Sequence, residues 1–492
     1  MKKAVVVIGA GIAGLAAAIR LRAAGHEVTI YEANAYAGGK LTEIRGAGYR
    51  FDAGPSLFTM PQYVDELFTL AGKDPRDYFQ YERLSTICKY FWDDGTELTT
   101  SMDKEKTAQN ISNTLGESSK VVRHHLSDAE TKYNLTGRTF LEHSLHKLKS
   151  WLHSSTVTSI MQLYKLDLHR SMHGVNKSRF TNAKTVQLFD RYATYNGSNP
   201  YKTPGLLNII PHYEYGFGAY YPKDGMHSII KAILKLTADL GIEIKYNSKV
   251  ESIQHENGKV TGVLTYGDFK PADIVISNMD VYYTYKYLLE RKAKARQIKK
   301  QERSSSALIF YWGVKGKFPE LDLHNIFFAE DYKAEFDAIN RGEVHDDPTV
   351  YVNISSKHTE SDSPADSENW FTMINVPHDS GQDWKLIAEQ ARKNIIAKLS
   401  SLLHVSLSEL IEYEDILDPV LIDKRTSSHT GSLYGTSSNS MWAAFLRHPN
   451  FTSTLDGLYH CGGSVHPGGG IPLCLLSAKI VDDLIRTKFS SK

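Results

Sequence analysis

The sequence is poor in cysteine, in long apolar runs and in net charge. Only three of its 492 residues are cysteines, Cys88, Cys461 and Cys474. This small, odd number excludes a disulfide framework and fits a reducing compartment. Because no run of about twenty apolar residues is present, the sequence predicts no membrane-spanning helix. A net charge of only +1 gives no overall electrostatic reason to bind DNA or RNA, so we expect no nucleic acid partner.

The first residues, MKKAVVVIGAG, combine two lysines with a short apolar run. The run is shorter than the apolar part of a signal peptide and leads into glycines instead of a cleavage site, so we interpret it as a buried first β-strand. These features favour a cytoplasmic protein. A length of 492 residues predicts about two to four domains.

Glycines follow this strand at Gly9, Gly11 and Gly14, in the pattern G-x-G-x-x-G. The first permits a tight turn, the second lets the backbone approach a pyrophosphate, and the third lets a helix pack closely on the sheet. The free N–H groups at the start of that helix attract phosphate oxygens. Such glycines are weak evidence by themselves, because glycine is common in loops.

The residues after the glycines complete a dinucleotide-binding pattern. Leu15–Ala24 predicts a helix and Glu27–Tyr31 predicts a second strand. Glu32 then stands about twenty residues beyond the second glycine, where a carboxylate can bind the ribose hydroxyls. Up to this point the pattern fits NAD and FAD equally. The small residues of Gly38-Gly39-Lys40 allow a second close approach to an extended cofactor, and this segment resembles FAD enzymes of the glutathione-reductase and amine-oxidase type.

Residues 225–278 predict a second βαβ-like unit. We expect a helix at Met226–Leu240 and strands at Ile242–Tyr246, Lys249–His255, Lys259–Thr265 and Asp273–Ser277. An Asn257-Gly258 turn joins the second and third of these strands. FAD enzymes of this type build the cofactor domain from separated segments, and the middle segment contacts the adenine side, here near Val250. Farther on we expect strands at Ala307–Trp312, Thr349–Ile354 and Trp370–Val376, and an exposed polar loop at Ser361–Ser367.

A helical insert is predicted from about Lys104 to Phe180, where glycine and proline are rare and apolar residues recur at helical spacing. Its later part is basic and contains aromatic residues, among them Lys147, Lys149, Trp151 and Lys165. A stretch of this kind can lie on an anionic bilayer surface, and we predict that these four residues bind a membrane. The alternative is the solvated face of an ordinary helical lid.

The C-terminal segment Gly457–Lys479 is rich in glycine. Leu458–Cys461 predicts a buried strand, and a closing helix is expected from Pro472 to about Ile485. Between them, two groups of glycines bring backbone N–H groups close to a ligand. A helix N-terminus at this point can face the edge of a flavin that becomes negative on reduction.

Further motifs are spread along the chain: FDAGPS at Phe51–Ser56, RYATYNGSNPYKTP at Arg191–Pro204, YYPKDGM at Tyr220–Met226, GSLYG at Gly431–Gly435 and HPGGGIPLCLLSA at His466–Ala478. Together they are similar to the bacterial phytoene and carotenoid desaturase family. The similarity spans the whole chain, and Arg191–Pro204 looks closest to the hydroxycarotenoid 3,4-desaturase branch. One departure is Asp224, where the family more often has a glycine.

The resemblance implies an α/β fold with a Rossmann-like FAD-binding domain built from discontinuous segments, residues 1–75, 215–295 and 440–492. Residues 76–103 and 296–439 would form a β-sheet substrate domain, and residues 104–214 a helical lid that binds a membrane. No metal site is expected. The predicted FAD-binding residues are Gly9, Gly11, Ile12, Ala13, Gly14, Glu32, Ala33, Gly38, Gly39, Lys40, Gly54, Pro55, Ser56, Val250, Gly463, Ser464, Gly470, Ile471 and Pro472.

The function that the resemblance implies is removal of two hydrogens from a C40 carotenoid, with a hydroxyl group and an acyclic end, during carotenoid biosynthesis. The flavin takes a hydride from an allylic carbon, and a quinone or oxygen reoxidises it. A carotenoid is nearly insoluble in water, so the enzyme must take it from a membrane. This favours the membrane interpretation of the basic insert and predicts peripheral association with the inner face of the cell membrane.

Glu214 and His212 are the candidate bases for the accompanying proton loss. A carboxylate in an apolar tunnel has a raised pKa and can take a proton. The alternative is that both residues are structural and lie at a strand edge. His466 is expected to touch the flavin, to shape the end of the tunnel or to cap a loop.

Other functions are compatible with the same pattern. A carotenoid cis–trans isomerase would use reduced FAD without net oxidation, and a protein like the Rab GDP-dissociation inhibitors would bind ligands without flavin. The complete set of glycines and Glu32 argues against the second. A soluble amine oxidase would need an aromatic cage and a residue that attaches the flavin, and the sequence places neither.

Overall fold

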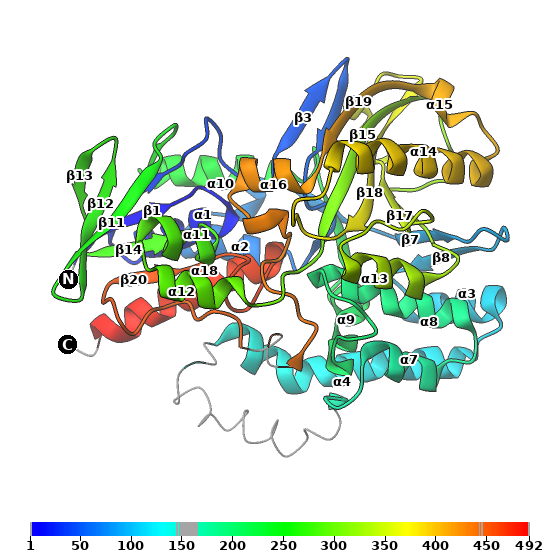
Figure 1. Cartoon of the computed structure of the whole chain (residues 1–492), viewed down its shortest axis with the longest axis horizontal. Coiled ribbons are helices and arrows are strands. Elements are labelled where there is room, and N and C mark those ends of the chain that lie inside the picture. Colours follow the sequence, from blue (N-terminus) through cyan, green and yellow to red (C-terminus); the bar gives the residue numbers. More distant parts are fainter. Residues whose placement is uncertain (1, 144–145, 147–165, 442, 444–445, 491–492) are drawn as a thin grey trace.

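A parallel five-stranded sheet carries the N-terminal glycine motif in this computed structural model, which describes residues 2–143, 146, 166–441, 443 and 446–490 (Figure 1). The strand order is β10-β2-β1-β14-β20, and every neighbouring pair is parallel. The strands are β1 (Ala4–Ile8), β2 (Glu27–Tyr31), β10 (Glu243–Lys245), β14 (Ile274–Ser277) and β20 (Leu458–His460). The strands predicted at these positions are confirmed, and three distant parts of the sequence form one sheet.

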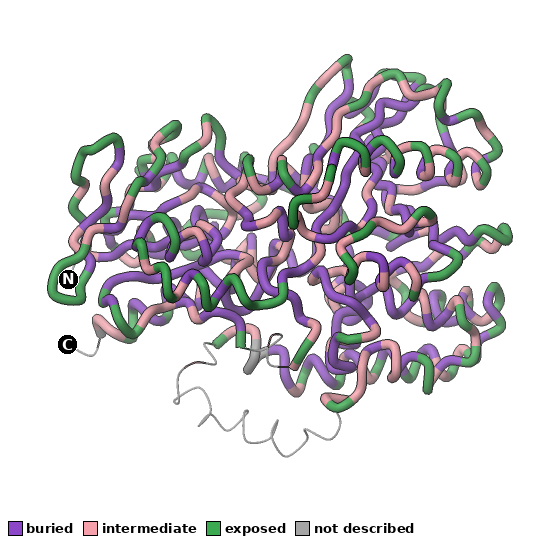
Figure 2. Tube along the Cα trace, in the orientation of Figure 1, coloured by how far each residue is buried: buried purple, intermediate pink, exposed green. Residues whose placement is uncertain are grey.

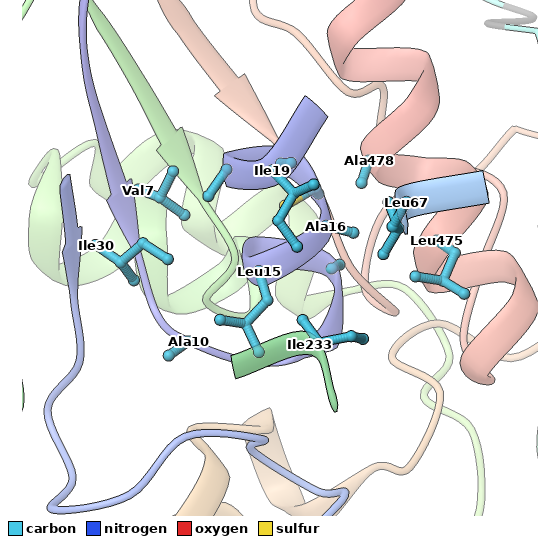
Figure 3. Packing of buried hydrophobic residues seen from close by; sticks show 14 of the residues in the cluster. Val7, Ala10, Leu15, Ala16, Ile19, Ile30, Leu67, Ile233, Leu475 and Ala478 are labelled. Carbon is cyan, nitrogen blue, oxygen red and sulfur yellow. The ribbon is translucent and has the colours of Figure 1, made fainter. Parts of the chain in front are cut away.

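The helix that follows the glycines, α1 (Ile12–Ala23), is buried between this sheet and three other helices. These are α2 (Gln62–Leu70), α10 (Ser228–Asp239) and α18 (Ile471–Ser490). Their apolar side chains close around α1 in Figure 3, which labels Val7, Ala10, Leu15, Ala16, Ile19, Ile30, Leu67, Ile233, Leu475 and Ala478. The small alanines of α1 let α18 approach closely, so both helices are fixed relative to the sheet.

A second sheet of seven strands has the order β19-β15-β18-β17-β16-β7-β8. All neighbours are antiparallel except β16 and β7, which are parallel. The strands are β7 (Thr86–Phe91), β8 (Glu97–Ser101), β15 (Ser306–Lys315), β16 (His324–Phe327), β17 (Val350–Asn353), β18 (Ser367–Val376) and β19 (Ile411–Leu417). The predicted strands of residues 307–312, 349–354 and 370–376 are confirmed. Figure 2 shows buried residues along the central strands of both sheets and exposed residues on the outer hairpins.

Helices cover the second sheet. α14 (Trp384–Leu403) packs through Ile395 and Leu399 against the buried Trp312 and Trp370. On the lower right of Figure 1, the predicted helical insert begins with α3 (Lys104–Leu115), α4 (Ser119–Glu142) and α7 (Met172–Arg179), followed by α8 (Ala183–Asp190) and α9 (Pro211–Tyr215). Within the described ranges, no helix combines the length and apolar character needed to cross a bilayer. Lys147, Lys149, Trp151 and Lys165 lie outside the described residues.

The remaining elements are short. They are the strands β3 (Glu43–Gly46), β4 (Tyr49–Asp52), β5 (Phe58–Thr59), β6 (Tyr81–Arg83), β9 (Ala219–Pro222), β11 (Val250–Glu256), β12 (Lys259–Thr265) and β13 (Asp268–Pro271), and the helices α11 (Val281–Tyr283), α12 (Lys292–Lys299), α13 (Tyr332–Arg341), α15 (Leu407–Leu410) and α16 (Pro419–Thr426). The helix predicted at Met226–Leu240 and the four strands predicted in the middle segment are confirmed as α10, β10, β11, β12 and β14. β11, β12 and β13 form a separate antiparallel sheet, because tight turns such as Asn257-Gly258 reverse the chain at once, whereas parallel pairing needs a long crossover.

The prediction that the polar loop 361–367 is exposed holds for Ser361 and residues 364–366, but Asp362, Ser363 and Ser367 are buried. Asp362 is fully buried and accepts hydrogen bonds from Arg50, at 3.0 and 3.2 Å. Arg50 also pairs with Asp52, whose carboxylate accepts from the backbone N–H groups of Met226 and His227, both at 2.8 Å. A buried guanidinium needs carboxylate partners, and the loop folds inward to supply one.

A buried glutamate on α13 predicts a pH-dependent stability. Glu335 is 1% exposed and one oxygen accepts a hydrogen bond from the Thr349 hydroxyl at 2.7 Å. Burial raises the pKa of Glu335 from its ordinary value near 4.5 to about 7. As the pH rises, the Glu335 carboxyl loses its proton near pH 4.5 in the unfolded state but only near pH 7 in the folded state. The free energy of unfolding therefore decreases as the pH rises from 4.5 through 7. Glu335→Gln, which resembles the protonated carboxyl, should remove this loss of about 3 kcal/mol.

The measurement is the difference in unfolding free energy between variant and wild type by urea denaturation at several pH values across this window. The difference should be small at the acid end and grow to its full value above neutral pH. Asp337→Asn is the matched control, since Asp337 lies on the same helix with a half-exposed side chain paired to Lys333. Its difference should stay within about 1 kcal/mol at all pH values. A pH-independent effect of Glu335→Gln would contradict the assignment.

Candidate functional site

A cavity of about 530 Å³ connects the glycine-rich end of the parallel sheet with one face of the seven-stranded sheet. Its size is within the range of small-molecule sites. One end is lined by backbone of Gly11, Gly39 and Gly463, and the other by side chains such as Tyr351 and Phe371. The cavity thus offers two environments, one rich in backbone N–H groups and one rich in apolar side chains.

Most of the predicted cofactor residues line this cavity. They are Gly11, Ile12, Ala13, Gly38, Gly39, Lys40, Gly54, Pro55, Ser56, Gly463, Ser464, Gly470, Ile471 and Pro472. The predicted residues that do not line it are Gly9, Gly14, Glu32, Ala33 and Val250. Gly9, Gly14 and Glu32 support the turn from behind, whereas Ala33 is exposed and the Val250 side chain is buried in a separate apolar cluster.

Two glycines are required by close backbone contacts. A Cβ atom on Gly14 would lie 2.2 Å from the carbonyl oxygen of Gly9, and one on Gly54 would lie 1.9 Å from the carbonyl oxygen of Lys40. Both distances are far below van der Waals contact, and neither partner is a flexible side chain. The first helix therefore packs on the glycine turn, and the loop at residues 54–56 packs on Lys40, each with no room for a side chain.

Glu32 is held at the end of β2 beside the glycine turn. Its carboxylate accepts hydrogen bonds from the backbone N–H groups of Ala10 at 2.7 Å and Asn34 at 2.8 Å. The residue is 7% exposed. The carboxylate therefore fixes the turn between β1 and α1, and its predicted contact with ribose hydroxyls stays a prediction.

Lys40 ties the glycine loop to the GSLYG segment. Its ammonium group donates to the carbonyl oxygens of Leu433 at 2.7 Å and Ser432 at 3.4 Å. Burial lowers the pKa of Lys40 to about 8. Lys40 therefore brings an amino group to the wall of the cavity and fixes the GSLYG segment there.

The N-terminus of α18 opens onto the same cavity. Ile471 and Pro472 begin the helix and line the cavity, so the unpaired N–H groups of its first turn and the positive end of its dipole face the space. His466 also lines it, and its Nε2 lies 3.0 Å from the carbonyl oxygen of His143. Burial lowers the pKa of His466 to about 4, so this imidazole is neutral.

Asp224 shows how the chain tolerates its departure from the family's motif. Its φ of +67° is in the left-handed region, which glycine adopts without strain and aspartate more readily than most residues. The next residue, Gly225, keeps a close contact in which a Cβ would lie 2.5 Å from the Arg50 guanidinium. The turn before α10 is thus preserved with one of its two glycines replaced.

Glu214 lines the cavity and is held by an arginine and two tyrosines. Its Oε2 accepts from the Tyr192 hydroxyl at 2.6 Å and from Arg191 at 3.3 Å, and its Oε1 accepts from the Tyr195 hydroxyl. Arg191 also donates to the Tyr90 hydroxyl at 2.5 Å. Both charged groups are buried, with 1% exposure for Glu214 and 5% for Arg191. This environment is a buried ion pair, in contrast to the apolar surroundings expected from the sequence.

His212 does not line the cavity. Its ring packs against Tyr133 and Phe217, with ring centroids 5.1 Å away in both cases. Burial lowers the pKa of His212. The residue lies on α9 and not at the predicted strand edge, because Pro211 starts a helical turn there. This placement argues against His212 as the base.

Sequence reasoning missed a polar chain on the far wall of the cavity. Ser56 Oγ lies 2.8 Å from the Tyr351 hydroxyl, which lies 2.7 Å from Nδ1 of His324. All three residues line the cavity. Neither Tyr351 nor His324 belongs to a motif, so no signal in a single sequence could have identified them.

Comparison with known proteins gives both a family and a fold. Residues 12–481 match the family described as flavin containing amine oxidoreductase. The chain is 50% identical over 486 residues to the 1-hydroxycarotenoid 3,4-desaturase of a Flavobacterium species, with 99% of each chain covered. It is 34% identical over 490 residues to the 4,4'-diapolycopene oxygenase of a Methylomonas species, covering 98% of this chain and 97% of that one. The crystal structure of an oxidoreductase from Methanosarcina mazei has a similar fold, with a TM-score of 0.66 at 17% identity and 100% of both chains covered.

Proposed function

The chain belongs to the flavin containing amine oxidoreductase family and is an FAD-dependent oxidoreductase, and we propose that its substrate is a carotenoid, from which it removes two hydrogens. The observation that carries the proposal is 50% identity, over 99% of both chains, with a relative named 1-hydroxycarotenoid 3,4-desaturase. By the chemistry of that name, the substrate carries a hydroxyl group at carbon 1 and acquires a double bond between carbons 3 and 4. The carotenoid and phytoene desaturase resemblance of the motifs supports the same class.

The residues of the cavity fit FAD. Gly11 and Gly39 would leave no Cβ in the way of a pyrophosphate, and the N-terminus of α18 would face the flavin. Glu32, which lies behind the glycine turn, is the proposed partner of the ribose hydroxyls. Bound FAD supplies a two-electron acceptor for hydride from carbon.

The protein's own part in the reaction is to bind and orient the polyene and to exclude water. Apolar side chains line the substrate end of the cavity, namely Ile87, Leu206, Ile209, Ile210, Ile326, Phe371 and Met373. They can hold an apolar chain against the cofactor cradle with little desolvation cost. A quinone or oxygen as the final electron acceptor completes the proposal.

The test is expression in cells that make a panel of carotenoids, followed by mass and absorption spectra of the products. A desaturase yields a product with two fewer hydrogens and absorption at longer wavelength. A product of unchanged mass with a changed spectrum would indicate an isomerase. If no carotenoid in the panel changes in mass or spectrum, the proposed function is refuted. Identity of 34% with a diapolycopene oxygenase favours oxygenation as the second candidate, which would add oxygen to the product mass.

Peripheral membrane association is part of the proposal, because the substrate resides in the bilayer. The basic residues Lys147, Lys149 and Lys165 support it from the sequence. Replacing all three with glutamine should weaken co-sedimentation with anionic vesicles, by about 1 kcal/mol per lysine. The control replaces the exposed Lys315, Lys385 and Lys393, which belong to or flank the seven-stranded sheet and its helix. Equal binding by both triple variants would refute a membrane role for the insert.

A further inference from the structure

Four side chains that line the cavity carry a buried polar atom without a hydrogen-bond partner among the described residues. These atoms are Arg191 Nε, Asn196 Oδ1, His324 Nε2 and His466 Nδ1. A buried donor left without a partner costs roughly 1–3 kcal/mol. Such atoms in a binding cavity point to polar groups of the ligand. His324 is the most informative of the four, because its surroundings fix which ring nitrogen carries the proton.

The Nδ1 atom of His324 is an acceptor. The Asn353 amide nitrogen lies 3.2 Å from it and also donates to the carbonyl oxygen of Leu323 at 2.9 Å, which fixes the orientation of the amide. Burial lowers the pKa of His324 to about 3, so the ring is neutral. A neutral imidazole with an acceptor at Nδ1 carries its proton at Nε2. The unpartnered atom is therefore an N–H donor.

The position of His324 is close to the cofactor loop. Its Nδ1 and Ser56 Oγ are both within hydrogen-bond distance of the Tyr351 hydroxyl, at 2.7 and 2.8 Å. Ser56 follows Gly54 and Pro55 in the loop that packs on Lys40. A ligand atom that meets His324 thus lies near the loop at residues 54–56, which the sequence predicts to contact FAD.

A second residue that lines the cavity, Arg191, also has a buried N–H group without a partner among the described residues. The terminal nitrogens of Arg191 donate hydrogen bonds to Glu214 and to the Tyr90 and Tyr192 hydroxyls. Its Nε has no hydrogen-bond partner within the part of the chain that the structure describes. Its charge is near enough to His324 to disfavour a second proton on the imidazole. A buried N–H group without an acceptor favours a ligand that carries an oxygen atom over a pure hydrocarbon.

We propose that His324, through its Nε2–H group, binds the hydroxyl oxygen of the substrate and so selects hydroxylated carotenoids. This inference rests on the proposed function. A hydroxyl at carbon 1 is separated by only one carbon from carbon 3, where the new double bond begins. The hydroxyl must therefore lie beside the reacting carbons, and His324 is placed to hold it there and to set which bond meets the flavin.

The test uses two variants that each keep one half of the imidazole. Asparagine resembles the Nδ1 side, so His324→Asn keeps a group for Tyr351 and Asn353 but loses the inward donor. Glutamine places an amide N–H near Nε2, so His324→Gln keeps that donor. Each is assayed for kcat and KM with a 1-hydroxycarotenoid and with the same carotenoid lacking the hydroxyl group. His404→Asn is the control, because His404 is exposed at a left-handed helix end that asparagine tolerates.

We expect wild type to favour the hydroxylated substrate, and His324→Asn to lower kcat/KM for that substrate by roughly 100-fold while the hydrocarbon rate changes less than about threefold. His324→Gln should retain most of the preference, and FAD content should be equal in all variants. An equal loss with both substrates, or an unchanged preference, would overturn the role of His324. If wild type acts on neither substrate, the proposed function fails; if it acts on both without preference, only this inference fails.

Discussion

Replacing Gly14 with alanine is expected to yield protein that is purified with little or no FAD. The new methyl group would lie 2.2 Å from the carbonyl oxygen of Gly9, an atom of the turn itself. To reach van der Waals contact the first helix must move away from the turn by about 1 Å. The helix is enclosed by α2, α10 and α18, so the movement would disturb the whole glycine turn.

The expected consequence is a loss of FAD affinity of at least roughly 100-fold, since displacement of directed hydrogen bonds by about 1 Å has effects of this order. The measurement is the ratio of flavin to protein absorbance after purification, followed by titration of the apoprotein with FAD. Gly174→Ala is the control: it changes a glycine inside α7, where the nearest atom to a Cβ is Ser171 Oγ at 3.2 Å. A Gly14→Ala protein that is purified with a full complement of FAD would show that the contact between Gly14 and the Gly9 carbonyl oxygen is not needed for FAD binding.

Replacing Glu214 with alanine is expected to destabilise the protein by about 3–5 kcal/mol. The substitution leaves the Arg191 guanidinium buried without its carboxylate, and removes the acceptor for the Tyr192 and Tyr195 hydroxyls. The destabilisation comes from burying the Arg191 charge without a partner. Its free-energy penalty is larger than the net stabilisation that the intact Arg191–Glu214 pair provides. We therefore expect Glu214 to act as the partner of Arg191 and not as the base suggested by the sequence.

A second variant separates these two roles. In Arg191→Met with Glu214→Gln, the charge is removed from both sides while an amide oxygen remains for the tyrosines. This double variant should recover at least about half of the lost stability, because the two sites are coupled. Unfolding free energy from urea denaturation is measured beside turnover at equal FAD content. A Glu214→Gln protein with wild-type stability but no turnover would instead support the base.

The cofactor half of the site could be predicted from sequence because its signals are local. The central strands β1 and β14 of the parallel sheet are short apolar runs, and the predicted approaches to the cofactor are marked by glycines, as at Gly38 and Gly54. The substrate half depends on contacts between distant residues. His324 and Tyr351 meet only because β16 pairs with β17, and nothing in either segment marks them as functional.

The misjudged segments have the same cause. Residues 361–367 read as an exposed loop because they are polar, yet Asp362 is drawn inside by Arg50, more than three hundred residues earlier. Glu214 was expected in an apolar tunnel, but the short helix at Arg191–Asn196 aims one guanidinium and two phenols at it. Burial of a polar group is decided by its partners, and a single sequence does not name them.

The parallel sheet has a consequence for the order in which the protein is made. Its edge strand β20 and the helix α18 that packs on α1 are synthesised after β1 and the glycine turn, with more than four hundred residues between them. The glycine turn and the strands around it therefore stay without β20 and α18 while these residues are synthesised. Pairing of such distant segments is slow. Because FAD needs both halves, its uptake would come at the end of folding and trap the finished chain.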